Sequence, residues 1–192
     1  LRVRSREAVY NRLEAAFERL ERRRAVGDIG GYGVATWDAF RVPRDHDAYL
    51  SLPEVVARAE AAAGAVGADE HGLIAVQLPF NVTMADAVTV AAHRHPTDDR
   101  DVSALEYAQA ADLDVVASAT LAQGSLAASI PAAVDAELGG DTPAQRAINF
   151  ARSAPGVTVA LAGTGSPAHV AENVASGTFE PLGARAFDAV FE

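Results

Sequence analysis

The chain has 192 residues, of which 49% are hydrophobic, and it carries a formal net charge of −10. It contains no cysteine, which excludes disulfides, thiolate catalysis and zinc–thiolate sites. The acidic balance argues against nucleic acid or an anionic membrane as partner, and no apolar run predicts a membrane span. No leader with a basic start and an apolar middle is present, so we expect a cytoplasmic protein. Because the first residue is Leu1, we expect its natural start to lie upstream.

Charge is distributed unevenly along the chain. Lysine is absent, and residues 1–24 carry eight arginines against four glutamates (+4), whereas the remainder carries eight arginines against 22 acids (−14). The basic segment is expected to be a solvated helix face, with a binding patch as the alternative. An acidic, lysine-free, alanine-rich composition is typical of salt-loving cells, although a GC-rich genome would give a similar bias.

The first half of the chain alternates helical and extended patterns. Apolar residues recur at helical spacing from Ser5 to about Arg24, and a glycine-containing strand follows at 29–36. Ser51 and Pro53 begin a second helix that runs to about Ala63. The apolar run 73–78 predicts a strand with both faces covered.

A less regular stretch separates this half from the next helix. Residues 82–95 predict a short helical insertion, and 97–101 a polar turn. His93 and His95 could chelate a metal, but no carboxylate cluster completes such a site, so we expect none. Ser103 begins a third helix that continues through Ala111.

The same alternation continues to the end of the chain. A strand is predicted at 115–118, and an extra helix at 130–138. Thr142 and Pro143 begin a long helix, and a further strand starts at Val157. Gly163-Thr164-Gly165 then breaks the pattern, and Ser166 and Pro167 suit the start of a last helix. Residues 176–192 are expected to form a tail.

Strand and helix alternate four times, which predicts a parallel sheet with right-handed crossovers. Two architectures fit: an open doubly wound sheet, or part of a (β/α)8 barrel, for which four strands are half. We treat residues 1–192 as a single partial domain. The turn at 163–166, which joins a strand to a helix start, is suited to presenting backbone N–H groups to a phosphate.

The strand and loop segments resemble those of the aldo/keto reductase family, in the family's order. The matching strings are YGVATW (32–37), VQLPFN (76–81), ASATLAQGSL (117–126), TPAQRAINFARS (142–153) and ALAGTGSPAHVAENV (160–174). The resemblance covers nearly the whole chain and implies the C-terminal half of a (β/α)8 TIM barrel. It also implies NADP or NAD as cofactor, and reduction of a carbonyl substrate by hydride transfer.

The same resemblance implies roles for residues after the second and third strands. Gln77 would bond the nicotinamide carboxamide, because an amide both donates and accepts. Ser118 would stand where the family commonly stacks an aromatic ring on the nicotinamide. Leu121, Gln123 and Gly124 would lie near the pyrophosphate, where glycine lets the backbone approach.

Residues after the fourth strand would hold the adenosine part of the cofactor. Gly163, Thr164, Gly165 and Ser166 would lie near its phosphate at the helix start. Glu172 and Asn173 would reach the adenine edge. His169 stands where the family commonly has an arginine for the 2′-phosphate, and Gly163 where a lysine is found, which weakens the preference for NADP over NAD.

The resemblance implies no catalytic residue in this chain. The family's tyrosine, lysine, aspartate and histidine lie on its first four strands, and a chain without lysine cannot assemble a Tyr–Lys couple. Ala35 and Thr36 replace the family's serine–asparagine pair. The chain would therefore be the cofactor-binding portion of a reductase. The alternatives are a non-catalytic nucleotide-binding or interaction module, or a doubly wound sheet that binds another nucleotide at its switch point.

A half barrel would leave apolar side chains without partners. We expect Val34, Ile74, Val76, Val116 and Val159 to face the missing strands, and the two edge strands to be bare. The expected partner is therefore the missing N-terminal half barrel or a second copy of the chain.

Overall fold

The computed structural model describes residues 5–135 and 137–191. Arg2 and Arg4 of the basic segment, Ala136 of the predicted extra helix and Glu192 of the predicted tail lie outside the described residues. In the described part, none of the helices combines the length and apolar character that crossing a bilayer requires.

Four parallel strands form the central sheet, and their spatial order follows the chain. The strands are β1 (Tyr32–Ala35), β2 (Leu73–Pro79), β5 (Asp114–Ser118) and β6 (Val157–Ala160). A doubly wound sheet reverses direction at a switch point, whereas this sheet advances one way throughout. The predicted partial (β/α)8 barrel is therefore confirmed, and the doubly wound alternative is wrong.

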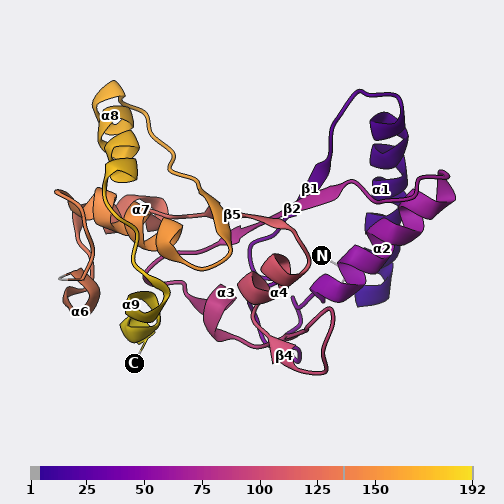
Figure 1. Cartoon of the computed structure of the whole chain (residues 1–192), viewed down its shortest axis with the longest axis horizontal. Coiled ribbons are helices and arrows are strands. Elements are labelled where there is room, and N and C mark those ends of the chain that lie inside the picture. Colours follow the sequence, from indigo (N-terminus) through magenta and orange to yellow (C-terminus); the bar gives the residue numbers. More distant parts are fainter. Residues whose placement is uncertain (1–4, 136, 192) are drawn as a thin grey trace.

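The helices cover one face of this sheet and flank its two ends (Figure 1). At one end lie α1 (Arg6–Ala25) and α2 (Leu52–Ala65), which contact each other extensively, and at the other lie α7 (Pro143–Ser153) and α8 (Pro167–Ala175). The helix α4 (Ala104–Ala110) lies between these pairs.

Side-chain caps fix where most of these helices begin. The hydroxyl of Ser51 accepts the Glu54 N–H at the start of α2, and Ser103 does the same for Glu106 at the start of α4. Thr142 and Gln145 form a reciprocal capping box at the start of α7. These local signals explain why the predicted helix starts agree with the structure.

Shorter elements fill the connections between the sheet strands. They are α3 (Asp86–Thr89), β3 (His93–Arg94), β4 (Asp101–Val102), η1 (Ala122–Gly124), α5 (Ser125–Ala128), α6 (Ala132–Asp135), η2 (Ser176–Thr178), α9 (Ala184–Asp188) and η3 (Ala189–Phe191). The short helical insertion predicted at 82–95 is present as α3, whereas the antiparallel pair of β3 and β4 was not predicted. The helix expected at 130–138 shrinks to α6, and β1 is shorter than predicted because glycines at 30 and 31 weaken the strand start.

The two faces of the sheet differ sharply in burial. Val76 and Val115, which are adjacent in register, are fully buried beneath the helices, and Val34 packs against the same core. The opposite face carries Val116, half-buried, and Val159, 44% exposed. The expectation that Val34 and Val76 face the missing strands is therefore wrong, because an apolar parallel strand does not reveal which of its faces is covered.

The core is centred on a stack of phenylalanines. Phe80 follows β2, and its ring centroid lies 5.5 Å from that of Phe150 on α7 and 6.3 Å from that of Phe187 on α9. Phe80, Phe150 and Phe187 are fully buried. The segment after α8 thus returns to the centre of the fold and holds the end of β2 in place.

A buried carboxylate joins α1 to the sheet. Glu21, only 1% exposed, accepts hydrogen bonds from the Tyr32 hydroxyl (2.7 Å) and the Gly72 N–H (2.6 Å), and pairs with Arg24 (3.2 Å). Burial opposes ionisation of Glu21, but these three donors outweigh it and lower the pKa of the carboxyl. The contact fixes the starts of β1 and β2 relative to α1.

Candidate functional site

Because the four strands are parallel, their carboxyl ends lie at one edge of the sheet. We call the segments that follow the strands there, 36–37, 77–81, 118–124 and 161–166, the carboxyl rim. The register pairs Pro79 with Ser118, and Ala117 with Ala160, so the exits of β2, β5 and β6 are neighbours. Gln77 lies near the end of β2, and the segments that contain Gly124 and Gly165 follow the ends of β5 and β6 at this edge.

Gln77 points to the bare face of the sheet near this rim. In register it lies between Ala35 of β1 and Val116 of β5, and it lines a hollow of about 210 Å³ with them. Within the described residues its side-chain amide makes no hydrogen bond, although its backbone carbonyl accepts the Thr36 N–H at 2.9 Å. A half-buried amide with free donors and acceptors can bind a polar group placed over the sheet.

Thr36, directly after β1, carries an unpartnered hydroxyl. Its Oγ1 is buried and has no hydrogen-bond partner in the described part of the chain. Leaving a buried polar atom without a partner costs about 1–3 kcal/mol, so such atoms are often associated with a site that takes a ligand. Sequence reasoning noted Thr36 only as a departure from a pattern and missed this feature.

The loop after β5 is unusually strained. Ala119, Ala122 and Gln123 have φ values of 53°, 45° and 57°, in the left-handed region that favours glycine, and Gly124 follows with 96°. The Asn81 amide donates to the Ala119 carbonyl at 2.8 Å, which helps to hold the loop. Strain of this kind concentrates at ligand-binding turns, and successive left-handed residues turn backbone N–H groups toward one side.

Ser118 and Leu121 frame this loop. Ser118 is the last residue of β5, half-buried, and its carbonyl accepts the Phe80 N–H at 3.0 Å. The Leu121 carbonyl accepts N–H groups from Gly124 (2.8 Å) and Leu126 (3.2 Å) and so closes the turn. Gln123 and Gly124 are exposed at its tip.

The segment after β6 is exposed and leads directly into the start of α8. Gly163, Thr164 and Gly165 are exposed, and the Thr164 hydroxyl accepts the Ser166 N–H at 3.3 Å. Ser166 occupies the N-cap position as predicted, but its side chain makes no capping bond. The first N–H groups of α8 therefore lack the side-chain acceptor that α2, α4 and α7 have.

Glu172 and Asn173, which are predicted to contact the adenine, lie further along α8, on the side of α7. The Glu172 carboxylate accepts a hydrogen bond from the Thr142 hydroxyl at 2.5 Å, and its backbone carbonyl accepts one from Gln145 at 3.2 Å. Asn173 is half-buried next to it, and His169 is exposed in the first turn of α8. Glu172 thus already ties α8 to α7, and contact with a ligand would compete with the Thr142 bond.

The tyrosines of the described chain are structural. Tyr10 accepts the Ser51 N–H, Tyr32 donates to Glu21, and Tyr49 donates to the Ala92 carbonyl. Tyr107 is buried on α4, and burial raises its pKa to about 12. The chain contains no lysine that could pair with any of these tyrosines.

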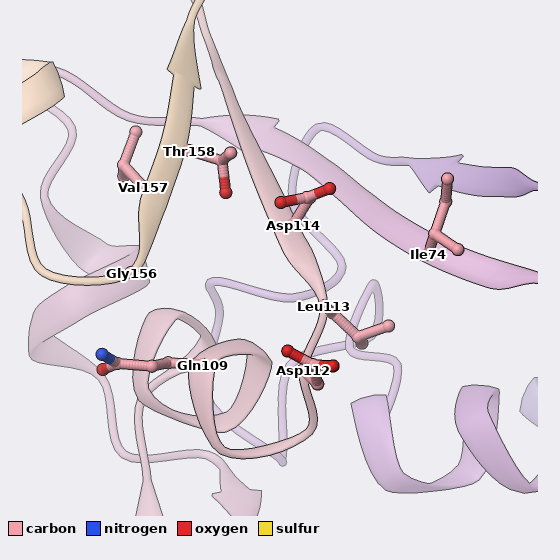
Figure 2. A pocket seen from close by; sticks show the side chains of 8 residues that line it. All are labelled: Ile74, Gln109, Asp112, Leu113, Asp114, Gly156, Val157 and Thr158. Atoms are coloured by element: carbon pink, nitrogen blue, oxygen red, sulfur yellow. The ribbon is translucent and has the colours of Figure 1, made fainter.

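A larger hollow of about 640 Å³ lies at the opposite end of the sheet, where β5 and β6 begin (Figure 2). Asp112 and Asp114 line it together with Gln109 and Thr158, and the Thr158 hydroxyl accepts the Val115 N–H at 3.2 Å. Within the described residues, no group of three or more His, Asp or Glu side chains could hold a metal ion.

His93 and His95 do not act together. His93 is fully buried, its Nδ1 accepts the Leu52 N–H at 3.2 Å, and its Nε2 lies 2.8 Å from the Phe40 carbonyl. His95 instead lies 3.3 Å from Asp98. The first histidine thus joins α2, β3 and the loop after β1 in the core.

Comparison with solved structures places this geometry in a known fold. The chain is similar to a thermostable aldo-keto reductase in complex with the inhibitor epalrestat (TM-score 0.61, 17% identity, 93% of this chain and 53% of that one). It is also similar to an aldo-keto reductase from Klebsiella pneumoniae in complex with NADPH (TM-score 0.58, 19% identity, 93% and 52%). A holo aldo-keto reductase from Bacillus halodurans aligns with a TM-score of 0.57, 16% identity, and coverage of 91% and 54%.

The chain has a partial aldo-keto reductase fold. It spans about half the length of each of these structures. No family model and no curated protein sequence matches the chain. At these identities the likeness is one of fold, and the aldo-keto reductase fold accounts for both the one-way strand order and the bare sheet face.

Proposed function

We propose that the carboxyl rim binds a nicotinamide dinucleotide, NADP or NAD, and that the chain is the cofactor-binding portion of a carbonyl reductase. The observation that carries the proposal is the joint position of three features at one edge of the sheet. These are the free amide of Gln77, the strained turn at 119–124 and the uncapped start of α8. A solved aldo-keto reductase structure, of which this chain matches about half, is in complex with NADPH, and this supports the choice of ligand.

The residues present fit such a cofactor. Gln77, whose side-chain amide faces the hollow beside Ala35 and Val116, would hold the carboxamide of the nicotinamide ring. Ser118 would stand beside the nicotinamide ring. Leu121, Gln123 and the exposed Gly124 would lie along the pyrophosphate, where the turn leaves room for close backbone approach.

The start of α8 would hold the adenosine phosphate. Gly163, Thr164, Gly165 and Ser166 precede a helix whose first N–H groups favour an anion. His169, Glu172 and Asn173 would contact the adenosine from α8. When bound, the cofactor supplies a hydride; the chain's own residues bind and orient it.

Selectivity for NADP over NAD would be weak at this site. A dianionic 2′-phosphate is best bound by two cationic side chains. At the two positions concerned, this chain has His169, in the first turn of α8, and Gly163, which contributes no charge. Charge-assisted hydrogen bonds contribute about 1.5–3 kcal/mol, so losing one lowers the preference for NADPH by roughly tenfold or more.

Proton donation to a carbonyl substrate would have to come from residues beyond this chain, since the described tyrosines are committed to the fold and lysine is absent. We therefore propose that turnover requires a complementary half barrel. The second candidate is a module that binds the dinucleotide without turnover, and it is favoured by the same lack of a Tyr–Lys couple.

A fluorescence titration with NADPH and NADH tests the binding proposal. We expect saturable binding, and a decrease in affinity of about two- to tenfold in Gln77→Ala, since a net hydrogen bond contributes about 0.5–1.5 kcal/mol. Gln109→Ala is the matched control, because Gln109 is exposed at the opposite hollow and its loss should not change affinity. Equal effects in both variants, or no binding to the parent chain, would contradict the proposal.

Turnover separates the two candidates. A protein that contains both halves of the barrel should oxidise NADPH in the presence of aldehydes or ketones, whereas a binding module should bind the cofactor and leave it unchanged. We also propose a cytoplasmic setting with high salt, supported by the cysteine-free, lysine-free and acidic composition.

A further inference from the structure

The capping box at the start of α7 makes hydrogen bonds beyond its own helix. In such a box, the side chains of the first residue and of the residue three positions later bond each other's backbone N–H groups. Thr142 and Gln145 do so, and each also reaches α8. The Thr142 hydroxyl donates to the Glu172 carboxylate at 2.5 Å, and the Gln145 amide donates to the Glu172 backbone carbonyl at 3.2 Å. Two side chains of one helix start therefore converge on a single residue of the next helix.

Gln145 fixes the backbone of Glu172, and Thr142 fixes its carboxylate. The Gln145 side chain is only 6% exposed, and its Oε1 accepts the N–H groups of Asp141 (2.8 Å) and Thr142 (3.3 Å). A buried amide that is bonded at both its oxygen and its nitrogen leaves α8 little freedom to shift at Glu172. In the described part of the chain, Thr142 is the one side chain that bonds the Glu172 carboxylate.

The Glu172 carboxylate keeps a second oxygen for another donor. Thr142 takes Oε1, whereas Oε2 makes no hydrogen bond within the described residues, and Glu172 as a whole is half-buried. A carboxylate accepts at both of its oxygens. A ligand donor at Oε1 would therefore compete with Thr142, but a donor at Oε2 can bond while the Thr142 contact stays in place.

Glu172 also lies on the face of α8 that begins at the carboxyl rim. His169, Glu172 and Asn173 are three and four residues apart, so they share one side of the helix with the N-cap residue Ser166, seven residues before Asn173. At 1.5 Å per residue, Glu172 lies about 9 Å along the helix from Ser166. A ligand with its phosphate at the start of α8 could therefore extend along this face toward Glu172.

We propose that Thr142 is a positioning residue of the dinucleotide site, whose hydroxyl holds the Glu172 carboxylate so that Oε2 accepts the amino group of the adenine. This inference rests on the proposed function, in which Glu172 contacts the adenosine. A glutamate free to rotate would lose side-chain entropy on binding the ligand. Because Thr142 already restrains Glu172 in the free chain, less of this entropy remains to be lost on binding.

Two reduced dinucleotides that differ at one group test this role. NADH carries the adenine amino group, whereas its hypoxanthine analogue has a carbonyl oxygen in that place, which cannot donate a hydrogen bond. We expect the parent chain to bind NADH about tenfold more tightly than the analogue, because a hydrogen bond to a charged group is lost. Fluorescence of the reduced nicotinamide, which both molecules contain, reports both affinities.

Three variants separate positioning from helix capping. Thr142→Gly removes the hydroxyl, and glycine is well tolerated at an N-cap. We expect it to weaken binding of NADH about two- to tenfold and to leave the hypoxanthine analogue unchanged. Thr142→Ser keeps the hydroxyl and should behave as the parent chain does. Ser51→Gly, which makes the same kind of change at the N-cap of α2, is the matched control and should alter neither affinity.

The outcomes distinguish this proposal from the proposed function. Equal weakening of both dinucleotides by Thr142→Gly would make Thr142 a purely structural cap and overturn the proposal, as would unchanged or tighter binding of NADH. Loss of the preference for NADH in Thr142→Ser would also overturn it. A parent chain that binds both dinucleotides equally would overturn the role of Thr142 and leave dinucleotide binding intact, whereas a parent chain that binds neither would refute the proposed function and this inference together.

Discussion

Replacement of Glu21 offers a quantitative test of how α1 is joined to the sheet. Glu21→Ala removes the acceptor of the Tyr32 hydroxyl and the Gly72 N–H, and both donors are in buried surroundings. Each orphaned buried donor costs about 1–3 kcal/mol, and breaking a buried charged contact costs about 3–5 kcal/mol. We expect Glu21→Ala to lower the free energy of unfolding by about 3–5 kcal/mol.

Glu21→Gln should cost less, because both neutral donors bond the same oxygen, Oε1, and an amide oxygen can replace it. Only the contact between Arg24 and Oε2 is lost, and Arg24 also donates to the Glu70 carbonyl. We expect about 1–2 kcal/mol for this variant. Urea unfolding followed by circular dichroism measures all of these values.

The exposed Glu18, paired with Arg22 at helical spacing, supplies the control. Glu18→Gln should change the free energy of unfolding by less than about 0.5 kcal/mol. Because the folded pKa of Glu21 is lowered, its contribution is present above the ordinary glutamate pKa and is lost as the pH falls. An alanine variant as stable as Glu18→Gln would refute the reasoning.

Three further changes have defined outcomes. Burial lowers the pKa of His93, so at acidic pH the unfolded chain binds a proton that the folded chain excludes. The free energy of unfolding should therefore decrease as the pH is lowered from about 6.5, and in urea titrations His93→Gln should flatten this dependence. Phe187→Ala should cost about 3–5 kcal/mol by calorimetry, because the side chain is fully buried between Phe80 and Phe150; a loss below about 1 kcal/mol would contradict this packing. His169→Arg should raise affinity for NADPH about tenfold and leave NADH unchanged in paired titrations, and an equal gain for both would exclude contact with the 2′-phosphate.

Local chemistry explains which elements the sequence predicts well. Ser51, Ser103 and Thr142 mark helix starts because each hydroxyl accepts an N–H within its own first turn. The order of strands and helices is equally local, and it predicts the parallel sheet and the partial barrel. Gln77 and Gly124 were expected at a shared edge, and parallel pairing places the exits of their strands there.

Features that depend on contacts between residues far apart in sequence could not be predicted in this way. Val34 and Val76 were expected to face the missing strands, since both faces of a parallel strand are apolar. Which face is covered is determined only by how the helices pack on the sheet. Alanine does not signal a left-handed backbone, so the strain at Ala119 and Ala122 has no sequence marker. No metal site was expected at His93, but its structural role could not be predicted either, because it depends on Leu52 and Phe40, about forty to fifty residues earlier.

Chemical-shift mapping by NMR during titration with NADPH tests the central claim most directly. The claim is that the exits of the parallel strands form one binding edge. We predict shifts in the side-chain amide of Gln77 and in backbone amides of 119–124 and 163–169, all saturating together. Shifts confined to Gln109, Asp112 and Thr158 at the opposite hollow, or no shifts at saturating NADPH, would contradict it.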